Sequence, residues 1–200
     1  MGNYSAFCVS ERAKLSAILM LATCVYPSCA REQVSPVYDA AGTIRRLDYD
    51  TDRDLQIDMR AYVLNGRTVR IEADGNGDGL VDRWEYYGPG GELDRIGTSS
   101  ESDGVEDTWV VQTGTEMRVD VATRRDGIAD RHEFHSNGLL VRAEQDTNGD
   151  GRLDQWQRFT DGQLRELLLD TSMASGRPNQ RLVYRPDGSV ERVDAQVGPQ

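Results

Sequence analysis

The sequence predicts an all-β protein, in which tandem 24-residue β-hairpin repeats form an extended or curled antiparallel meander after a short N-terminal helical signal segment. Glycine recurs every 24 residues, at Gly42, Gly66, Gly90, Gly114, Gly138 and Gly162. The short runs around these glycines alternate polar and apolar side chains, as strands with two different faces do. Aspartate-rich loops separate one pair of runs from the next. A fixed period of this length is typical of repeat proteins.

The first 30 residues differ in character from the rest. Arg12 and Lys14 precede the apolar run Leu15 to Tyr26, and small residues then follow as far as Ala30. This order describes a secretory signal peptide, and the apolar run is too short to span a membrane comfortably. We therefore expect export, to the periplasm or to a bacterial cell surface.

A lipoprotein leader is the alternative reading of the same segment, with Cys24 or Cys29 as the lipidated residue. The three cysteines, which include Cys8, all lie within this leader. The rest of the chain can therefore hold neither a disulfide nor a cysteine-based metal site. After the leader we expect a linker at 31–36, about six to seven repeats over 37–194 with the last degenerate, and a tail at 195–200.

Each repeat is expected to be one β-hairpin. The lattice glycines sit in turn dipeptides such as Asn65-Gly66 and Asn137-Gly138, and such dipeptides between alternating runs strongly favour a tight hairpin turn. Alternation places Trp84 and Tyr86 on one side of their strand and Val69 and Ile71 on one side of theirs. We expect stacked hairpins to share one continuous aromatic and aliphatic face, with the other face wet.

Two of the acidic loops carry the ligand pattern of a calcium-binding loop. Calcium takes six to eight oxygens from alternate positions of a tight loop, with glycine at position six and an acid at position twelve. The segment 74–85 supplies every one of these ligands and the glycine. The segment 146–154 supplies all but the twelfth-position acid, since Gln157 occupies that position. The expected ligands are Asp74, Asn76, Asp78, the carbonyl of Leu80, Asp82 and Glu85, and then Asp146, Asn148, Asp150, the carbonyl of Arg152 and Asp154.

The remaining loops match the pattern less well. The loop with Asp50, Asp52, Asp54 and Asp58 has Leu55 in place of the glycine, and the loop with Glu101, Asp103 and Asp107 lacks a twelfth-position acid. In the loop that contains Asp126 and Asp130, Arg124 occupies a ligand position and would repel the ion. We expect weaker sites in the first two of these and none in the third. An aspartate-rich loop that merely turns the chain is the alternative, since Asp, Asn and Gly are good turn formers.

The DxNxDG loops resemble those of EF-hands, dockerins and thrombospondin type 3 repeats. The hairpins, with WEYYGPGGEL and FHSNGLL, resemble those of MORN-type repeats. This motif-level resemblance covers nearly all of residues 34–194. It implies that the aspartates and the twelfth-position acid named above bind calcium. No EF-hand helix pair is predicted, so the groove opening of a calcium sensor is not expected.

Composition and motifs exclude several functions. The chain has 34 acidic against 23 basic residues and a net charge of −11, which argues against nucleic acid and favours cations. No nucleophile elbow, phosphate loop or Cys-His pair occurs, and His132 and His135 would point to opposite faces of a strand, so no enzyme is expected. The sequence indicates an exported calcium-binding repeat protein that serves as a structural or binding module of the cell envelope. The alternative is a calcium-independent MORN-like repeat that binds a partner protein, as an inhibitor or immunity factor would.

Overall fold

The computed structural model describes residues 33–172 and 175–195, and these ranges contain fourteen β-strands and no helix. The expected signal segment and its three cysteines lie outside the described residues. The chain divides into two units, and the second, Glu32–Gln200, contains every strand. Within the described ranges nothing is helical, long and apolar enough to be a membrane span.

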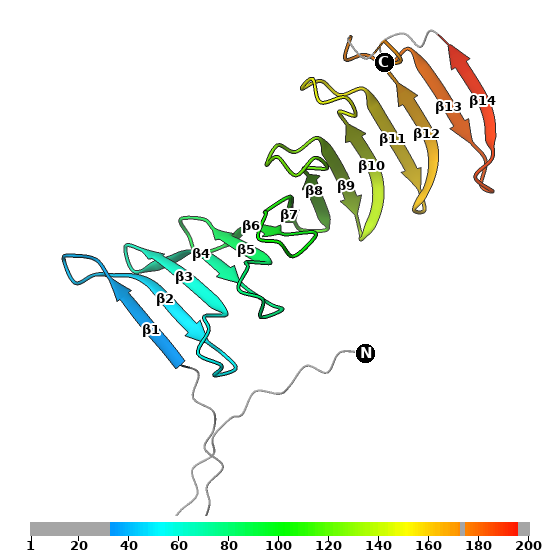
Figure 1. Cartoon of the computed structure of the whole chain (residues 1–200). Helices are drawn as coiled ribbons and strands as arrows, with labels where there is room; N and C mark the ends of the chain where they lie inside the picture. The colour runs from blue at the N-terminus through cyan, green and yellow to red at the C-terminus, as the bar shows by residue number, and fades with distance from the viewer. Residues whose placement is uncertain (1–32, 173–174, 196–200) are drawn as a thin grey trace, which may run out of the picture. The chain divides into compact units, whose positions relative to one another are not determined.

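All fourteen strands belong to one antiparallel sheet, and each is hydrogen-bonded to its neighbours in sequence (Figure 1). This confirms the all-β hairpin meander. The strands are β1 (Gln33–Tyr38), β2 (Ile44–Asp50), β3 (Met59–Leu64), β4 (Arg67–Ala73), β5 (Arg83–Tyr87), β6 (Leu93–Thr98), β7 (Thr108–Thr113), β8 (Glu116–Val121), β9 (Arg131–Ser136), β10 (Leu139–Gln145), β11 (Gln155–Thr160), β12 (Gln163–Leu169), β13 (Gln180–Tyr184) and β14 (Val190–Ala195). Strand β1 begins within the stretch 31–36 that the sequence indicated as a linker.

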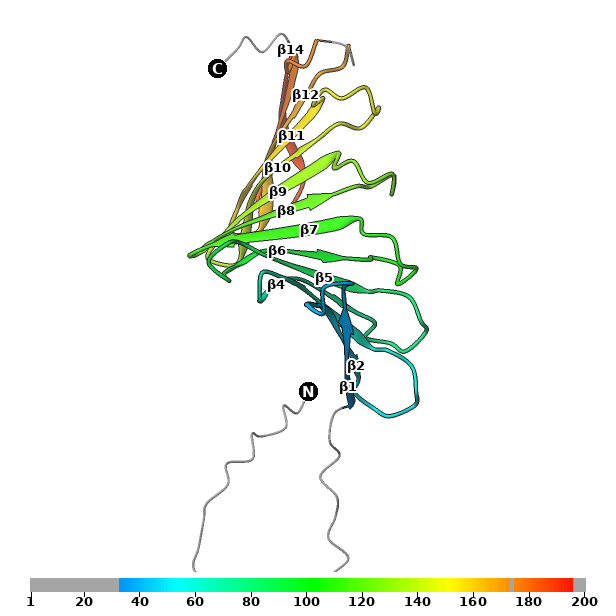
Figure 2. The ribbon, with the colours of Figure 1, turned by 90° about the vertical axis from the view of Figure 1, so that its left-hand side faces the viewer.

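The hairpin turns adopt the backbone that their sequences favour. Both residues of Asn65-Gly66 have positive φ, 52° and 77°, and those of Asn137-Gly138 have 51° and 79°. Positive φ at two successive residues is the mark of the turn that matches the twist of an antiparallel pair. In a meander, these turns all lie at one end of the strands and the acidic loops at the other end. In Figure 2 the acidic loops project to the right of the ribbon.

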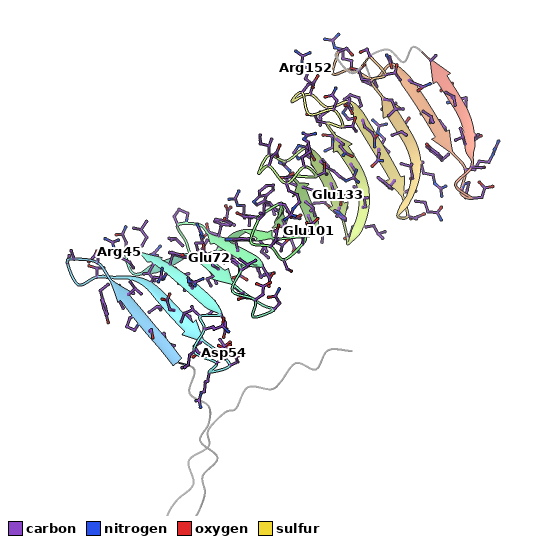
Figure 3. The ribbon with its side chains drawn as sticks, in the orientation of Figure 1. Arg45, Asp54, Glu72, Glu101, Glu133 and Arg152 are labelled. Carbon is purple, nitrogen blue, oxygen red and sulfur yellow. The ribbon has the colours of Figure 1, made fainter. Side chains whose placement is uncertain are left out.

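The expectation of one apolar face and one wet face is wrong. Glu72 pairs with Trp84 and Arg70 with Tyr86, whereas Ile71 pairs with Glu85. Directly paired residues share a face of a sheet, so the aromatic and aliphatic residues lie on opposite faces. The single-layer ribbon carries side chains on both sides (Figure 3).

Arginines alternate with aromatic rings along one of these faces, which we call the aromatic face. The guanidinium carbons of Arg70 and Arg95 lie 5.1 Å from the ring centroid of Tyr62 and 4.3 Å from that of Tyr86, respectively, and that of Arg142 lies 3.8 Å from the ring of Phe134. Contacts of this kind contribute about 0.5–1 kcal/mol each at exposed sites. These arginine–aromatic contacts add stability to a single-layer sheet that has no thick hydrophobic core.

Few apolar side chains are fully buried in the described part of the chain. They are Ala61, Trp84, Ala122 and Ala143. Of the three tryptophans, Trp84 is buried at 6% exposure, while Trp109 and Trp156 are half-buried on the same face. Trp84 therefore belongs to the small core, and the other two tryptophans are only partly covered.

Candidate cation-binding loops

The first five acidic loops share one conformation, with its own set of hydrogen bonds. We number the loops in chain order as loop 1 (50–58), loop 2 (74–82), loop 3 (99–107), loop 4 (122–130), loop 5 (146–154) and loop 6 (170–179), and count positions from the first residue of each. Positions four and six have positive φ in loops 1 to 5. In loops 2 and 5 glycine fills both positions, whereas loop 1 places Arg53 and Leu55 there.

The first-position aspartate is held by the loop's own backbone. In loop 2 the carboxylate of Asp74 accepts hydrogen bonds from the N–H groups of Gly77, at 2.8 Å, and Gly79, at 2.7 Å. Asp146 of loop 5 accepts the corresponding bonds from Gly149 and Gly151. These bonds orient the carboxylate across the loop and fix the two left-handed residues.

The ninth-position aspartate also has a partner within each loop. In loop 5 the backbone N–H and the hydroxyl of Thr147 both donate to Asp154, at distances of 2.9–3.2 Å. The same pair of donors comes from Thr51 in loop 1, Ser100 in loop 3 and Thr123 in loop 4. Loop 6 is one residue longer, and there Thr171 donates both bonds to Asn179 at position ten. The side chain that closes the loop is therefore held by donors of the loop itself.

Backbone hydrogen bonds connect each loop to the next. The N–H of Asp74 donates to the carbonyl of Asp58 at 2.8 Å, and that of Asp146 donates to the carbonyl of Asp130 at 2.8 Å. The corresponding bonds in the rest of the series join Ser99 to Asp82, Ala122 to Asp107 and Asp170 to Asp154. The loops thus form a continuous stack beside the sheet.

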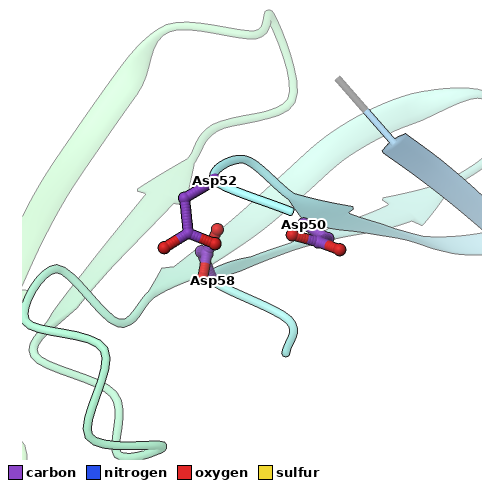
Figure 4. A group of neighbouring side chains, drawn as sticks. All are labelled: Asp50, Asp52 and Asp58. Carbon is purple, nitrogen blue, oxygen red and sulfur yellow. The ribbon is translucent and has the colours of Figure 1, made fainter. Parts of the chain in front are cut away.

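Loop 1 brings three carboxylates together. Oxygens of Asp50, Asp52 and Asp58 all lie within 4.8 Å of one another (Figure 4), and among the described residues this is the one acidic group so close. Hydrogen bonds from the hydroxyl and N–H of Thr51 lower the pKa of Asp58, so that carboxyl stays ionised at neutral pH. Sequence reasoning ranked this loop below loops 2 and 5.

Loop 2 leaves one carboxylate oxygen unpaired. Oδ2 of Asp82 accepts hydrogen bonds from Gly75 at 3.0 Å and Asn76 at 3.2 Å, whereas Oδ1 of Asp82 is buried without a hydrogen-bond partner. Asp78 accepts from the N–H of Leu80 and from the amide of Asn76. A buried unpaired acceptor is costly, and a cation is one group that would relieve that cost.

The expected twelfth-position ligand, Glu85, lies on β5 with partners on its own strand. Its carboxylate accepts hydrogen bonds from the guanidinium of Arg83 at 3.0 Å and the hydroxyl of Tyr87 at 2.5 Å. The bond from Tyr87 lowers the pKa of Glu85, and the same bond raises the pKa of Tyr87 to about 12. Among the ligands expected for loop 2, Glu85 thus has its hydrogen-bond partners on the sheet and not in the loop.

Loop 5 repeats the geometry of loop 2 but has a basic neighbour. Asn148 and Asp150 accept hydrogen bonds from the N–H groups of Asp150 and Arg152. Burial alone would raise the pKa of Asp146, but the N–H groups of Gly151 and Gly149 and the charge of Arg124 outweigh it and lower that pKa. One Arg124 nitrogen lies 3.9 Å from Oδ2 of Asp146.

The two histidines lie outside the loops, on one strand. His132 and His135 lie on β9, His132 with Nδ1 at 2.6 Å from Asp120 and His135 with Nε2 at 3.4 Å from Glu133. Because they are three residues apart on one strand, they point to opposite faces, as expected. They therefore do not form a zinc pair with each other.

No protein-family model matches the chain, and a comparison with curated proteins finds no significantly similar sequence.

Proposed function

We propose that this chain is an exported calcium-binding repeat protein that serves as a structural or binding module of the bacterial envelope. The observation that carries the proposal is the convergence of Asp50, Asp52 and Asp58 in loop 1. Three carboxylates within 4.8 Å repel one another at neutral pH, and a divalent cation among them removes that repulsion. The unpaired Oδ1 of Asp82 supports the same reading in loop 2.

In this proposal the ion joins neighbouring hairpins. Each loop connects two strands and hydrogen-bonds to the next loop, so an ion held in it restrains both. Extracellular calcium modules have dissociation constants of about 10⁻⁴–10⁻³ M. At free calcium about ten times the dissociation constant, each site would add about 1.4 kcal/mol to the free energy of unfolding. Export follows from the leader at 1–30, with a lipid on Cys24 or Cys29 as a further means of retention at the envelope.

The experiment is a thermal melt of the full chain in millimolar calcium, repeated in EDTA. We expect the melting temperature to be several degrees higher in calcium, because the ion binds only the folded loops. The triple variant D50N/D52N/D58N should respond less, whereas D120N, on the aromatic face, should respond as the parent does. Equal melting temperatures of the parent in calcium and EDTA would refute the proposal.

A calcium-independent repeat that binds a partner protein is the second candidate. It is favoured by the hydrogen bonds that close the loops from within, such as those to Asp74 and Asp154. It is also favoured by the exposure of both faces of the single-layer sheet. If this second candidate is right, the chain should have the same melting temperature in calcium and in EDTA.

A further inference from the structure

Loop 4 contains two consecutive arginines that reach in opposite directions along the loop stack. Arg125 forms ion pairs with Glu101, at 2.5 Å, with Asp107, at 3.2 Å, and with Asp103. These three acids occupy positions three, five and nine of loop 3, where loop 1 has Asp52, Asp54 and Asp58. The carboxylates that converge in loop 1 belong to positions one, three and nine, and loop 3 has Ser99 at position one. One guanidinium therefore contacts every acid at the ligand-type positions of loop 3.

The loop 3 contacts are those of a stable ion pair. Asp107 is 1% exposed, and a buried carboxylate needs a charged or hydrogen-bonding partner. A guanidinium is planar and always charged, so it can serve several carboxylates at once. The hydrogen bond from Arg125 lowers the pKa of Asp103, and the pKa of Arg125 is raised by the same bond.

Arg124 takes the other direction, across its own loop and into loop 5. Its guanidinium lies 3.3 Å from Oδ2 of Asp130 and 3.9 Å from Oδ2 of Asp146, and it donates to the carbonyl of Asp146 at 3.4 Å. It also packs on Gly149, where an added Cβ would lie 3.0 Å from the guanidinium carbon. Arg124 thus places a positive charge beside a loop that otherwise matches loop 2.

We propose that Arg124 and Arg125 are built-in counter-cations that decide which acidic loops take up a divalent ion. Arg125 fills loop 3 and excludes an ion there, and Arg124 does the same in loop 4 and weakens binding in loop 5. Loop 2 has Asn76 and Gly77 at the two corresponding positions and keeps its acids for the ion. The exclusion of an ion rests on the proposed calcium function, whereas the counter-cation role rests on the ion pairs alone.

Variants of the full chain test both parts. R125Q, R124Q and the control R118Q each remove one positive charge, but Arg118 pairs with Asp120 on the aromatic face. Calcium stoichiometry is measured by native mass spectrometry, affinities by titration calorimetry, and melting temperatures in EDTA by circular dichroism. R125K is the conservative variant, since lysine keeps the charge but not the planar fork.

We expect R125Q to bind one more calcium ion than the parent and to melt several degrees lower in EDTA. R125K should bind no additional ion, and R118Q should match the parent in stoichiometry. R124Q should tighten binding at loop 5 by roughly tenfold, because it removes a unit positive charge that lies 3.9 Å from Oδ2 of Asp146. Adding D103N to R125Q should abolish the extra ion and restore part of the lost melting temperature.

The outcomes separate this inference from the proposed function. If no variant binds calcium but R125Q still melts lower than R118Q in EDTA, the counter-cation role stands and the calcium function fails. If R125Q matches R118Q both in melting temperature in EDTA and in bound ions, the inference is wrong even when the parent binds calcium.

Discussion

At the scale of single residues, loop 1 has a leucine at a position whose backbone conformation favours glycine. Loop 1 adopts the backbone of loops 2 and 5, yet Leu55 has φ 75° at the position where they have glycine. A left-handed conformation costs an L-residue with a Cβ roughly 1–2 kcal/mol. The side chain of Leu55 is 86% exposed and recovers almost none of this cost by burial.

Leu55→Gly should therefore stabilise the protein. We expect the free energy of unfolding to rise by about 1 kcal/mol, which corresponds to a melting temperature roughly 2–4 °C higher for a chain of this size. The measurement is a pair of thermal melts in EDTA. Ile128→Gly is the matched control, since Ile128 is a 66% exposed loop residue without positive φ, and glycine there should lower stability slightly. A similar loss in both variants would show that loop 1 is not strained.

At the scale of the loop, the ninth position has two separable roles. Asp154 is 4% exposed and accepts the hydrogen bonds of Thr147 that close loop 5. Asn179, at position ten of the longer loop 6, accepts the same bonds from Thr171, so closure needs an acceptor and not a charge. The affinity for calcium, by contrast, rises with the number of charged ligands.

Asp154→Asn and Asp154→Ala should consequently behave differently. In EDTA, we expect D154A to lose about 1–3 kcal/mol of stability, since it removes the buried, charged acceptor of the N–H and hydroxyl of Thr147, while D154N loses little. In calcium, D154N should lose the part of the stabilisation due to loop 5. Urea unfolding in each condition provides the free energies. A loss for D154N in EDTA as large as that of D154A would mean that closure itself depends on charge.

The hairpins could be predicted from sequence because their determinants are local. Asn-Gly at 65–66 and 137–138 fixes the turn without reference to distant residues. The distribution of apolar residues between the faces depends instead on how β4 registers against β5 across loop 2. A shift of one residue moves a side chain to the other face, and alternation within a strand carries no information on that register.

The loops of the candidate site could likewise be predicted from sequence, but the contacts between loops could not. Ligand types and spacing identified loops 1 to 5, because each follows from a stretch of nine residues or slightly more. The contact of Arg125 with Glu101 and Asp103 joins residues more than twenty positions apart, and no motif marks it. The usable signal was the substitution of arginine at positions three and four of loop 4, one repeat after a loop with acids.

At the scale of the whole molecule, the loop carboxylates make stability depend on pH. Hydrogen bonds from Thr51, Arg125 and Ser172 are the main causes that lower the pKa values of Asp58, Asp103 and Asp170, in that order. A carboxyl whose pKa is lower in the folded state contributes stability above its unfolded pKa of about 3.9, and that contribution is lost as pH falls through the folded pKa.

The melting temperature in EDTA should therefore stay nearly constant between pH 6 and 8 and fall steeply below about pH 4. The fall should be smaller in D58N, because asparagine keeps an acceptor for Thr51 and has no proton to gain. Circular dichroism melts across the pH range measure both. Equal acid sensitivity of D58N and the parent would show that Asp58 does not contribute to this dependence.

Every strand pairs only with the strands next to it in sequence, from β1 to β14. A duplicated or deleted 24-residue unit would consequently meet the same neighbours as the unit it copies or replaces. Gene rearrangement could therefore lengthen or shorten the array in whole steps without inventing a new interface, so the span of the protein is itself a heritable trait open to selection.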